Sequence, residues 1–167
     1  GAVRWLGPGR AEAARRQAMV FQRPVMLRRS VAANIDYALK LRDIPHARRV
    51  ARIREVLEET GLTPLARHAA RHLSIGEQQR LALSRAWATA PEVLFLDEPT
   101  ASLDPAATRA VEEIIAAIDR SGTKIIMTTH DLGQARRLAD EIVFLHRGRL
   151  MEQRPAAAFF ASPATTG

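Results

Sequence analysis

The chain has 167 residues, of which 47% are apolar and 26% charged, and this fits one globular domain with a sizeable core. The lack of cysteine excludes disulfides and thiolate metal sites and fits a reducing compartment such as the cytoplasm. No apolar run approaches the ~20 residues that cross a bilayer. The net charge of +7 comes from arginines that stand singly or in pairs without interleaved aromatic residues. We therefore expect a solvated basic surface and no nucleic-acid partner.

The first half of the chain predicts two strands and then only helices. The strands are expected at residues 2–7 and 18–21, with a turn between them. Apolar residues at helical spacing then predict three helices, at residues 30–42, 45–61 and 74–88.

The second half alternates strands and helices. The continuous apolar run at residues 93–96 is typical of a strand buried on both faces of a parallel sheet. Asp104 and Pro105 predict the start of a helix, as its cap and first residue, and Gly122 predicts its end. The remaining predicted elements are a strand over residues 123–130, a hairpin turning at Arg147 and Gly148, and a short helix in residues 155–163.

This alternation predicts an α/β fold in which helices flank a parallel or mixed sheet. The stretch of residues 24–88 stands out because it is helical throughout. We therefore expect a single domain over residues 1–167, in which residues 1–23 and 89–167 form the core and residues 24–88 an inserted helical subdomain.

The segment LSIGEQQR opens the third expected helix. Ser74 and Glu77 have the spacing of a capping box, in which the two side chains satisfy free N–H groups at a helix start. With Gly76 between them, the same helix start also presents exposed N–H groups to an anion. From this segment alone, a plain helix start and an anion site remain equally open.

The segment VLFLDEPT places Asp97 and Glu98 at the end of a buried strand, where open α/β sheets bind ligands. One carboxylate there can hold Mg²⁺ on a nucleotide and its neighbour can activate a water molecule. The alternative is a strand end with two solvated acids. Gln22 and His130 also stand at the ends of predicted strands, where each can position a water or a phosphate or be an ordinary surface residue.

Taken in order, Gln22, LSIGEQQR, VLFLDEPT, ASLD and TTH resemble the ATP-binding subunits of ABC transporters over nearly the whole chain. The resemblance implies a P-loop NTPase-like fold that binds ATP and Mg²⁺. It implies that Gln22 is a catalytic and Mg²⁺-binding residue that also links the nucleotide to a membrane partner. Ser74, Gly76 and Glu77 occupy positions of the signature motif, which contacts the γ-phosphate of ATP held by the opposite subunit.

The resemblance gives the remaining motif residues roles at the nucleotide. Asp97 is the expected Mg²⁺ ligand and Glu98 the expected general base. Ser102 and Asp104 lie in the expected D-loop, and His130 is the expected switch histidine.

The chain departs from the family pattern in two respects. Ile75 and Glu77 stand where the family usually has glycine and glutamine, although Ile75 keeps its backbone N–H. The chain also lacks a G-x-x-x-x-G-K-[ST] loop, the Walker A motif that cradles phosphates, and neither Lys40 nor Lys124 lies in one. We expect residues 1–167 to be the later portion of a longer subunit. Alone, they should bind ATP poorly and leave apolar sheet faces uncovered.

The resemblance implies a transport ATPase on the inner face of the cell membrane, most like bacterial importers of tungstate or molybdate. Phosphate and polar amino acids are the alternative cargoes. Expected partners are a second copy of the subunit, membrane permease subunits that meet residues 20–39, and an extracytoplasmic substrate-binding protein. Two other functions remain open. A DNA-repair ATPase would need a long coiled coil after Gln22, and a non-catalytic chain would supply only the signature half-site.

Overall fold

The computed structural model describes residues 9–161, so the strand expected at residues 2–7 lies outside it. The chain forms two compact units, Gly1–Thr128 and Thr129–Gly167. Their secondary structure differs, because the first unit contains a three-stranded sheet and the second a two-stranded one. Among the helices of residues 9–161, none has the length and apolar character that a membrane span requires.

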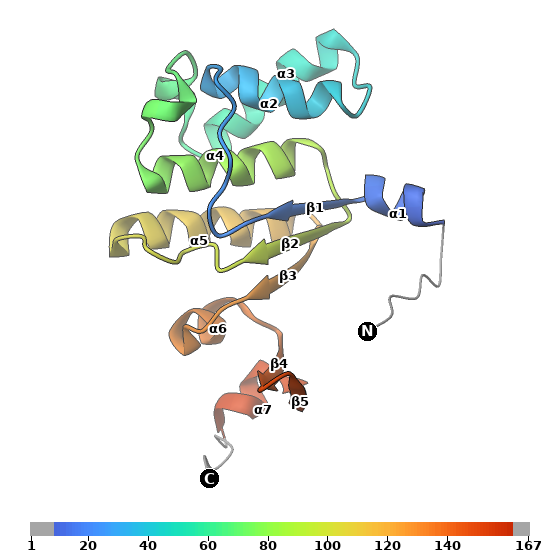
Figure 1. Ribbon diagram of the computed structural model, residues 1–167, viewed down its shortest axis with the longest axis vertical. Coiled ribbons are helices and arrows are strands. Elements are labelled where there is room, and N and C mark those ends of the chain that lie inside the picture. Colours follow the sequence, from blue (N-terminus) through green and yellow to red (C-terminus); the bar gives the residue numbers. More distant parts are fainter. Residues whose placement is uncertain (1–8, 162–167) are drawn as a thin grey trace. The chain divides into compact units, whose positions relative to one another are not determined.

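A parallel sheet forms the base of the first unit (Figure 1). Its strands are β1 (Gln17–Val20), β2 (Val93–Asp97) and β3 (Lys124–Thr128), with β2 in the middle. Leu94 and Leu96 are almost completely buried, whereas Val93 and Phe95 are only half-buried, so β2 is buried on one face and not on both faces as predicted. The strands predicted at residues 18–21 and 93–96 are nevertheless confirmed.

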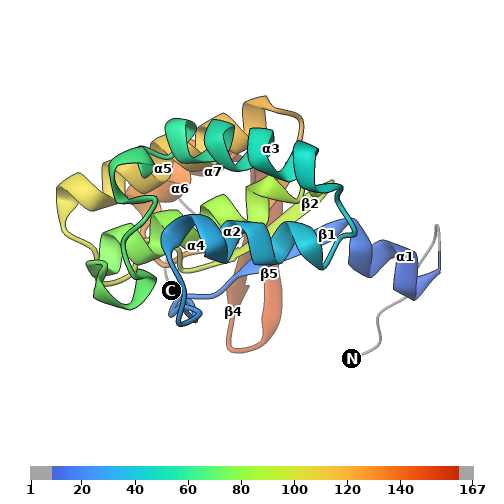
Figure 2. The same ribbon diagram turned by 90° about the horizontal axis from the view of Figure 1, so that it is seen from above.

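Three helices and two 3₁₀ turns lie between β1 and β2. They are α2 (Val31–Lys40), α3 (His46–Glu59), the turns Thr63–Leu65 and Ala70–His72, and α4 (Ile75–Ala88). All three predicted helices are confirmed, and Figure 2 shows them from above. Their apolar stripes meet in one core, whose buried members are Val31, Ile35, Leu39, Val56, Leu57, Leu62, Ala70, Leu73, Leu81 and Ala88.

The helices α4 and α5 (Pro105–Arg120) run side by side and pack on the sheet, α4 against β1 and α5 against β3. The opposite face is open. Met19, Phe95 and Ile126 are paired across the three strands and share this face, because alternate residues of a strand point the same way. Met19 is 50% exposed and Ile126 48% exposed. An apolar face of the sheet is therefore uncovered in this chain, as expected from the sequence.

One helix of the first unit differs from the sequence prediction. The helix α1 (Arg10–Arg15) precedes β1, where the sequence predicted only a turn, and the first residues of that turn lie outside the described residues. The sequence following Gly9 is rich in alanine and arginine, has Glu12 in the first turn and ends on Arg15, all of which favour a helix. The preceding Gly-Pro-Gly sequence, by contrast, indicates only a turn.

The second unit consists of two short helices and a hairpin: α6 (Leu132–Leu138), β4 (Glu141–His146), β5 (Arg149–Pro155) and α7 (Ala156–Ala161). Strands β4 and β5 are antiparallel. Their turn lies at Arg147 and Gly148, whose φ angles of 47° and 73° suit a tight hairpin turn. The predicted hairpin and last helix are confirmed, whereas α6 was not predicted.

Candidate functional site

The candidate site lies at one edge of the sheet in the first unit, where strands end and helices begin. The three strands are parallel, so their carboxyl ends lie at the same edge of the sheet. In Figure 1, α4 and α5 begin at this edge. Open α/β sheets bind ligands outside the carboxyl ends of their strands, and helix starts offer N–H groups to anions. The edge therefore combines the two features of a phosphate site.

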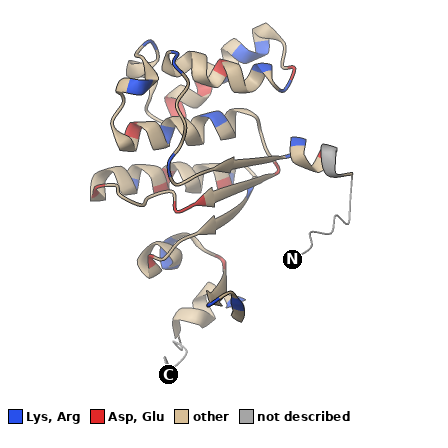
Figure 3. Ribbon diagram, viewed as in Figure 1, with Lys and Arg blue, Asp and Glu red and all other residues tan. Residues whose placement is uncertain are grey.

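The end of β2 carries the acidic pair, which Figure 3 shows in red. Asp97 is paired in register with Thr128 of β3, whose Oγ1 donates a hydrogen bond of 2.8 Å to Asp97 Oδ1. The N–H of Glu98 donates to the carbonyl oxygen of Thr128 at 3.1 Å. Glu98 has φ of 47°, in the left-handed region that non-glycine residues seldom adopt. The chain therefore bends sharply after Asp97, and Thr128 holds both sides of the bend.

The donor chemistry of this edge fits a nucleotide-bound Mg²⁺. In residues 9–161 no group of three or more His, Asp or Glu side chains is arranged to hold a metal ion alone. Mg²⁺ does not need such a group, because it is commonly held by one or two carboxylates together with phosphate oxygens and water. Asp97 can supply one of these carboxylates.

The signature segment begins α4 with a complete capping box. Ser74 Oγ accepts from the N–H of Glu77 at 3.3 Å, and Glu77 Oε2 accepts from the N–H of Ser74 at 2.8 Å. Ser74 Oγ also lies 2.9 Å from Glu77 Oε2. The hydrogen bond from the Ser74 backbone is the main cause that lowers the pKa of Glu77 below its usual value. Ser74 is exposed at the helix start, and its side chain is oriented by an ionised carboxylate.

Gly76 lies in unusually close contact with α5. A Cβ atom built on Gly76 would lie 2.9 Å from the Cβ of Ala107, closer than two such carbons approach in proteins. The glycine therefore allows the start of α4 to pack directly on the start of α5. The sequence did not indicate Ala107, because an alanine in a helix carries no functional signal.

The predicted D-loop leads directly to this contact. Ser102 is exposed and has φ of 68°. Asp104 caps α5, because its Oδ1 accepts from the N–H groups of Ala106 and Ala107, each at 2.9 Å. The bond from Ala107 is the main cause that lowers the pKa of Asp104, and that from Ala106 adds to it. The side chain of Asp104 is thus used within its own helix.

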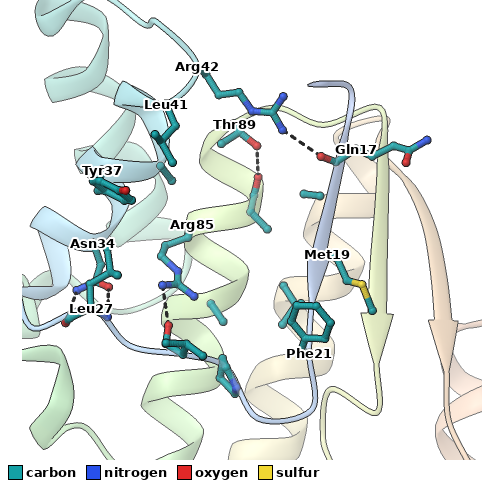
Figure 4. Close-up of a pocket in the computed structure, with 17 residues that line it drawn as sticks. Gln17, Met19, Phe21, Leu27, Asn34, Tyr37, Leu41, Arg42, Arg85 and Thr89 are labelled. Carbon is teal, nitrogen blue, oxygen red and sulfur yellow. Dashed lines mark hydrogen bonds between the residues drawn. The ribbon is translucent and has the colours of Figure 1, made fainter. Parts of the chain in front are cut away.

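Gln22 is exposed and lies two residues beyond the end of β1, so it follows the same edge of the sheet as Asp97. Beside this segment the structure has a pocket of about 410 Å³ between β1, α2 and α4 (Figure 4). Exposed apolar side chains on its lining are Phe21, Val25, Tyr37 and Leu41.

Two arginines line this pocket, and no acidic residue does. Arg42 donates to the carbonyl oxygens of Arg15 and Gln17 on β1. Arg85 of α4 donates to the carbonyl oxygen of Val25 at 2.8 Å, and burial lowers its pKa from the usual value. Arg42 thus ties the turn after α2 to the end of α1 and the start of β1, and Arg85 ties α4 to the segment after β1.

The position of His130 corrects one predicted boundary. The strand expected to end at His130 ends at Thr128. The next residues prepare α6: Thr129 Oγ1 accepts from the N–H of Asp131, and Asp131 Oδ1 accepts from the N–H of Gln134, each at 3.0 Å. His130 is exposed and belongs to the second unit, between the strand and the cap of α6. Asp131 and Gln134, at cap spacing, were the missed signal for this helix.

Comparisons with known proteins identify the family of the chain. A family model described as ABC transporter matches residues 4–101. The chain is 43% identical over 153 residues to the tungstate uptake system ATP-binding protein TupC of Peptoclostridium acidaminophilum, covering 91% of this chain and 72% of that protein. It is 40% identical over 161 residues to the phosphate import ATP-binding protein PstB 1 of Yersinia pestis, covering 89% of this chain and 57% of that protein.

Among solved structures, cbiO1 from Clostridium perfringens, part of the ABC transporter complex cbiONQ, superposes with a TM-score of 0.83 at 27% identity, covering 90% of this chain and 61% of that one. The predicted P-loop NTPase-like α/β fold is thereby confirmed. The chain spans less than two thirds of PstB 1 and of cbiO1. With a family model matched over residues 4–101 and a relative 43% identical over 91% of its length, the chain belongs to the ABC transporter family.

Proposed function

We propose that this chain is the motif-bearing part of an ATP-binding subunit that hydrolyses ATP to drive import across a membrane. The observation that carries the proposal is the edge where β2 ends in Asp97 and Glu98 while α4 and α5 begin. A strand end with paired acids next to helix starts is suited to a magnesium-bound triphosphate. The matched relatives are named as ATP-binding proteins of uptake and import systems.

In this function Asp97 binds the Mg²⁺ of the nucleotide, with Thr128 orienting its carboxylate. Glu98 accepts a proton from the attacking water as general base. Gln22, two residues after the end of β1, contacts the water, the metal or the γ-phosphate. His130, two residues after the end of β3, is the proposed switch histidine.

The signature segment serves the nucleotide of a second copy of the subunit. Ser74 is exposed at the start of α4, where the capping box uses the N–H groups of Ser74 and Glu77. A phosphate from outside would therefore be met by the Ser74 hydroxyl and the N–H groups of Ile75 and Gly76. Ser102 and Asp104 lie at the neighbouring start of α5, within reach of the same interface. Closing of two such subunits around two ATP molecules would drive transport.

The pocket of Figure 4 suits the membrane partner. It adjoins Gln22, has an apolar exposed rim that includes Val25 and Leu41, and carries the positive charges of Arg42 and Arg85. Exposed apolar side chains gathered around a pocket are typical of a protein contact. We assign this surface to permease subunits at the inner face of the membrane.

An inorganic oxyanion is the proposed cargo, with tungstate first. TupC supports tungstate, whereas PstB 1, at nearly the same identity, supports phosphate. The cargo binds the extracytoplasmic binding protein and the membrane partner, and it acts on this subunit only through them. Titrating the binding protein of the same system with tungstate and with phosphate by calorimetry decides between them. If neither anion releases or absorbs heat on binding, both cargoes are rejected.

The substitution Glu98→Gln tests the proposed function. In the intact protein it removes the proton acceptor but keeps the size of the side chain, so ATP hydrolysis should fall at least ~100-fold while ATP binding is kept. Glu113→Gln, at an exposed position of α5, is the matched control and should hydrolyse ATP at the wild-type rate. Wild-type turnover by Glu98→Gln would reject Glu98 as the base.

A further inference from the structure

At the edge where α4 and α5 begin, Gly76 and Ala107 are in close contact. The 2.9 Å separation between the Cβ of Ala107 and a Cβ built on Gly76 leaves no room for a second methyl group. Both positions belong to first turns, since Gly76 is the second residue of α4 and Ala107 the third of α5. Neither atom can yield by rotating a side chain, because both Cβ positions are fixed by the helix backbones.

Each first turn is also fixed to a motif residue. Ser74 is held to the first turn of α4 through its paired hydrogen bonds with Glu77. Asp104 is held to the first turn of α5 through the N–H of Ala107 itself, at 2.9 Å. The contact between Gly76 and Ala107 therefore connects the signature serine rigidly to the D-loop.

We infer that Ala107 is a positioning residue for ATP hydrolysis: its methyl group, packed against Gly76, sets the separation between the signature segment and the D-loop. This inference rests on the proposed function. Gly76 is then required for close packing within one subunit, and not only for an approach to phosphate. The two segments present themselves to the opposite subunit as one rigid unit, so an increased separation would impair closure on ATP.

The inference is tested by substitutions that transfer one methyl group from Ala107 to position 76. Gly76→Ala in the intact protein should lower kcat for ATP about tenfold or more, with little change in KM, because the opposite subunit's own groups hold most of the nucleotide. The double variant Gly76→Ala with Ala107→Gly leaves one methyl group in the contact and should recover kcat to within about threefold of wild type.

The control is Gly76→Ala with Ala106→Gly. Ala106 is the exposed neighbour of Ala107, so this pair makes the same change in composition without freeing space at Gly76. It should remain as slow as Gly76→Ala alone. Equal rescue by both double variants, or no rescue by Ala107→Gly, would overturn the inference and leave direct phosphate contact as the role of Gly76.

The unfolding temperatures of the same variants report on the contact without turnover. Gly76→Ala and Ala107→Gly should be non-additive, whereas Gly76→Ala and Ala106→Gly should add. Absence of hydrolysis by the wild-type protein would count against the proposed function. Additive unfolding temperatures for the first pair would count against the contact itself.

Discussion

At the end of β2, Asp97 is held by Thr128, the first residue of the TTH segment, to which the sequence alone assigned no role. Thr128 donates its hydroxyl to Asp97 and accepts the N–H of Glu98 at its carbonyl oxygen. A carboxylate held in this way presents its oxygens in a defined direction, which a metal ion with strict octahedral geometry requires. Thr128 therefore acts on the site through Asp97.

Replacing Thr128 by valine keeps the shape of the side chain and removes its donor. We expect Thr128→Val to lower the free energy of unfolding by about 0.5–1 kcal/mol, since the pair is exposed. It should also weaken the Mg²⁺ dependence of ATP hydrolysis. Thr128→Ser keeps the hydroxyl and should behave as wild type in an Mg²⁺ titration of activity. Identical Mg²⁺ titrations for Thr128→Val and Thr128→Ser would show that the hydrogen bond to Asp97 does not contribute to Mg²⁺ binding.

The sequence indicated the residues with chemical groups and missed those that position them. Asp97 and Glu98 were found because paired acids after an apolar run have a known use, and the capping box of Ser74 because its signal lies within four residues. Thr128 and Ala107 act through contacts made only when β3 and α5 fold against β2 and α4. Their side chains are common in any strand or helix.

Among the elements, three helices begin with a carboxylate that accepts backbone N–H groups. Glu77 serves α4, Asp104 serves α5 and Asp131 serves α6, and these bonds lower the pKa of all three. Because the folded pKa lies below the unfolded value of ~4, each group stabilises the fold fully above that value. The stabilisation is lost as the pH falls through the folded pKa.

The free energy of unfolding should therefore decline as the pH is lowered below about 4. Asp104→Asn isolates one contribution, since asparagine caps a helix as well as aspartate but does not titrate. Urea titrations from pH 7 to pH 2.5 should show a smaller acid loss for this variant than for wild type. A larger loss in Asp104→Asn would contradict the role of the carboxylate.

Elements with long apolar periodicity were predictable, whereas two of the short helices were not. The helices α2, α3 and α4 and the central strand β2 show their pattern over whole turns or a continuous run. By contrast α1 and α6 have only six and seven residues, too few for a stripe to appear. They are determined by end signals and by packing, and the end of β3 shifted because the cap of α6 takes the residues around His130.

On the scale of the molecule, the open sheet face determines how the chain behaves in isolation. Met19, Phe95 and Ile126 form an apolar row, whereas parallel sheets are normally covered on both faces. Exposed apolar rows of this kind lead to association. The division into a core and a helical subdomain remains a prediction at this scale.

We expect residues 1–167 alone to self-associate through this face. Ile126→Thr should reduce the association, measured by light scattering at several concentrations, and leave the unfolding temperature nearly unchanged. Ile125→Thr is the matched control, because Ile125 is only partly exposed and shares a face with the buried Leu94. This substitution should destabilise the fold without reducing self-association. A monomeric wild-type chain would contradict the expectation.

The central claim is that Glu98 of one subunit works on ATP together with Ser74 of another. Two inactive variants of the intact protein, Glu98→Gln and Ser74→Asp, test it by mixing. Aspartate still caps α4 but repels phosphate, so each homodimer has two dead sites. A mixed dimer contains one site with both Glu98 and Ser74 intact, and ATP hydrolysis should reappear on mixing. Mixed dimers that form and remain inactive would contradict the shared site.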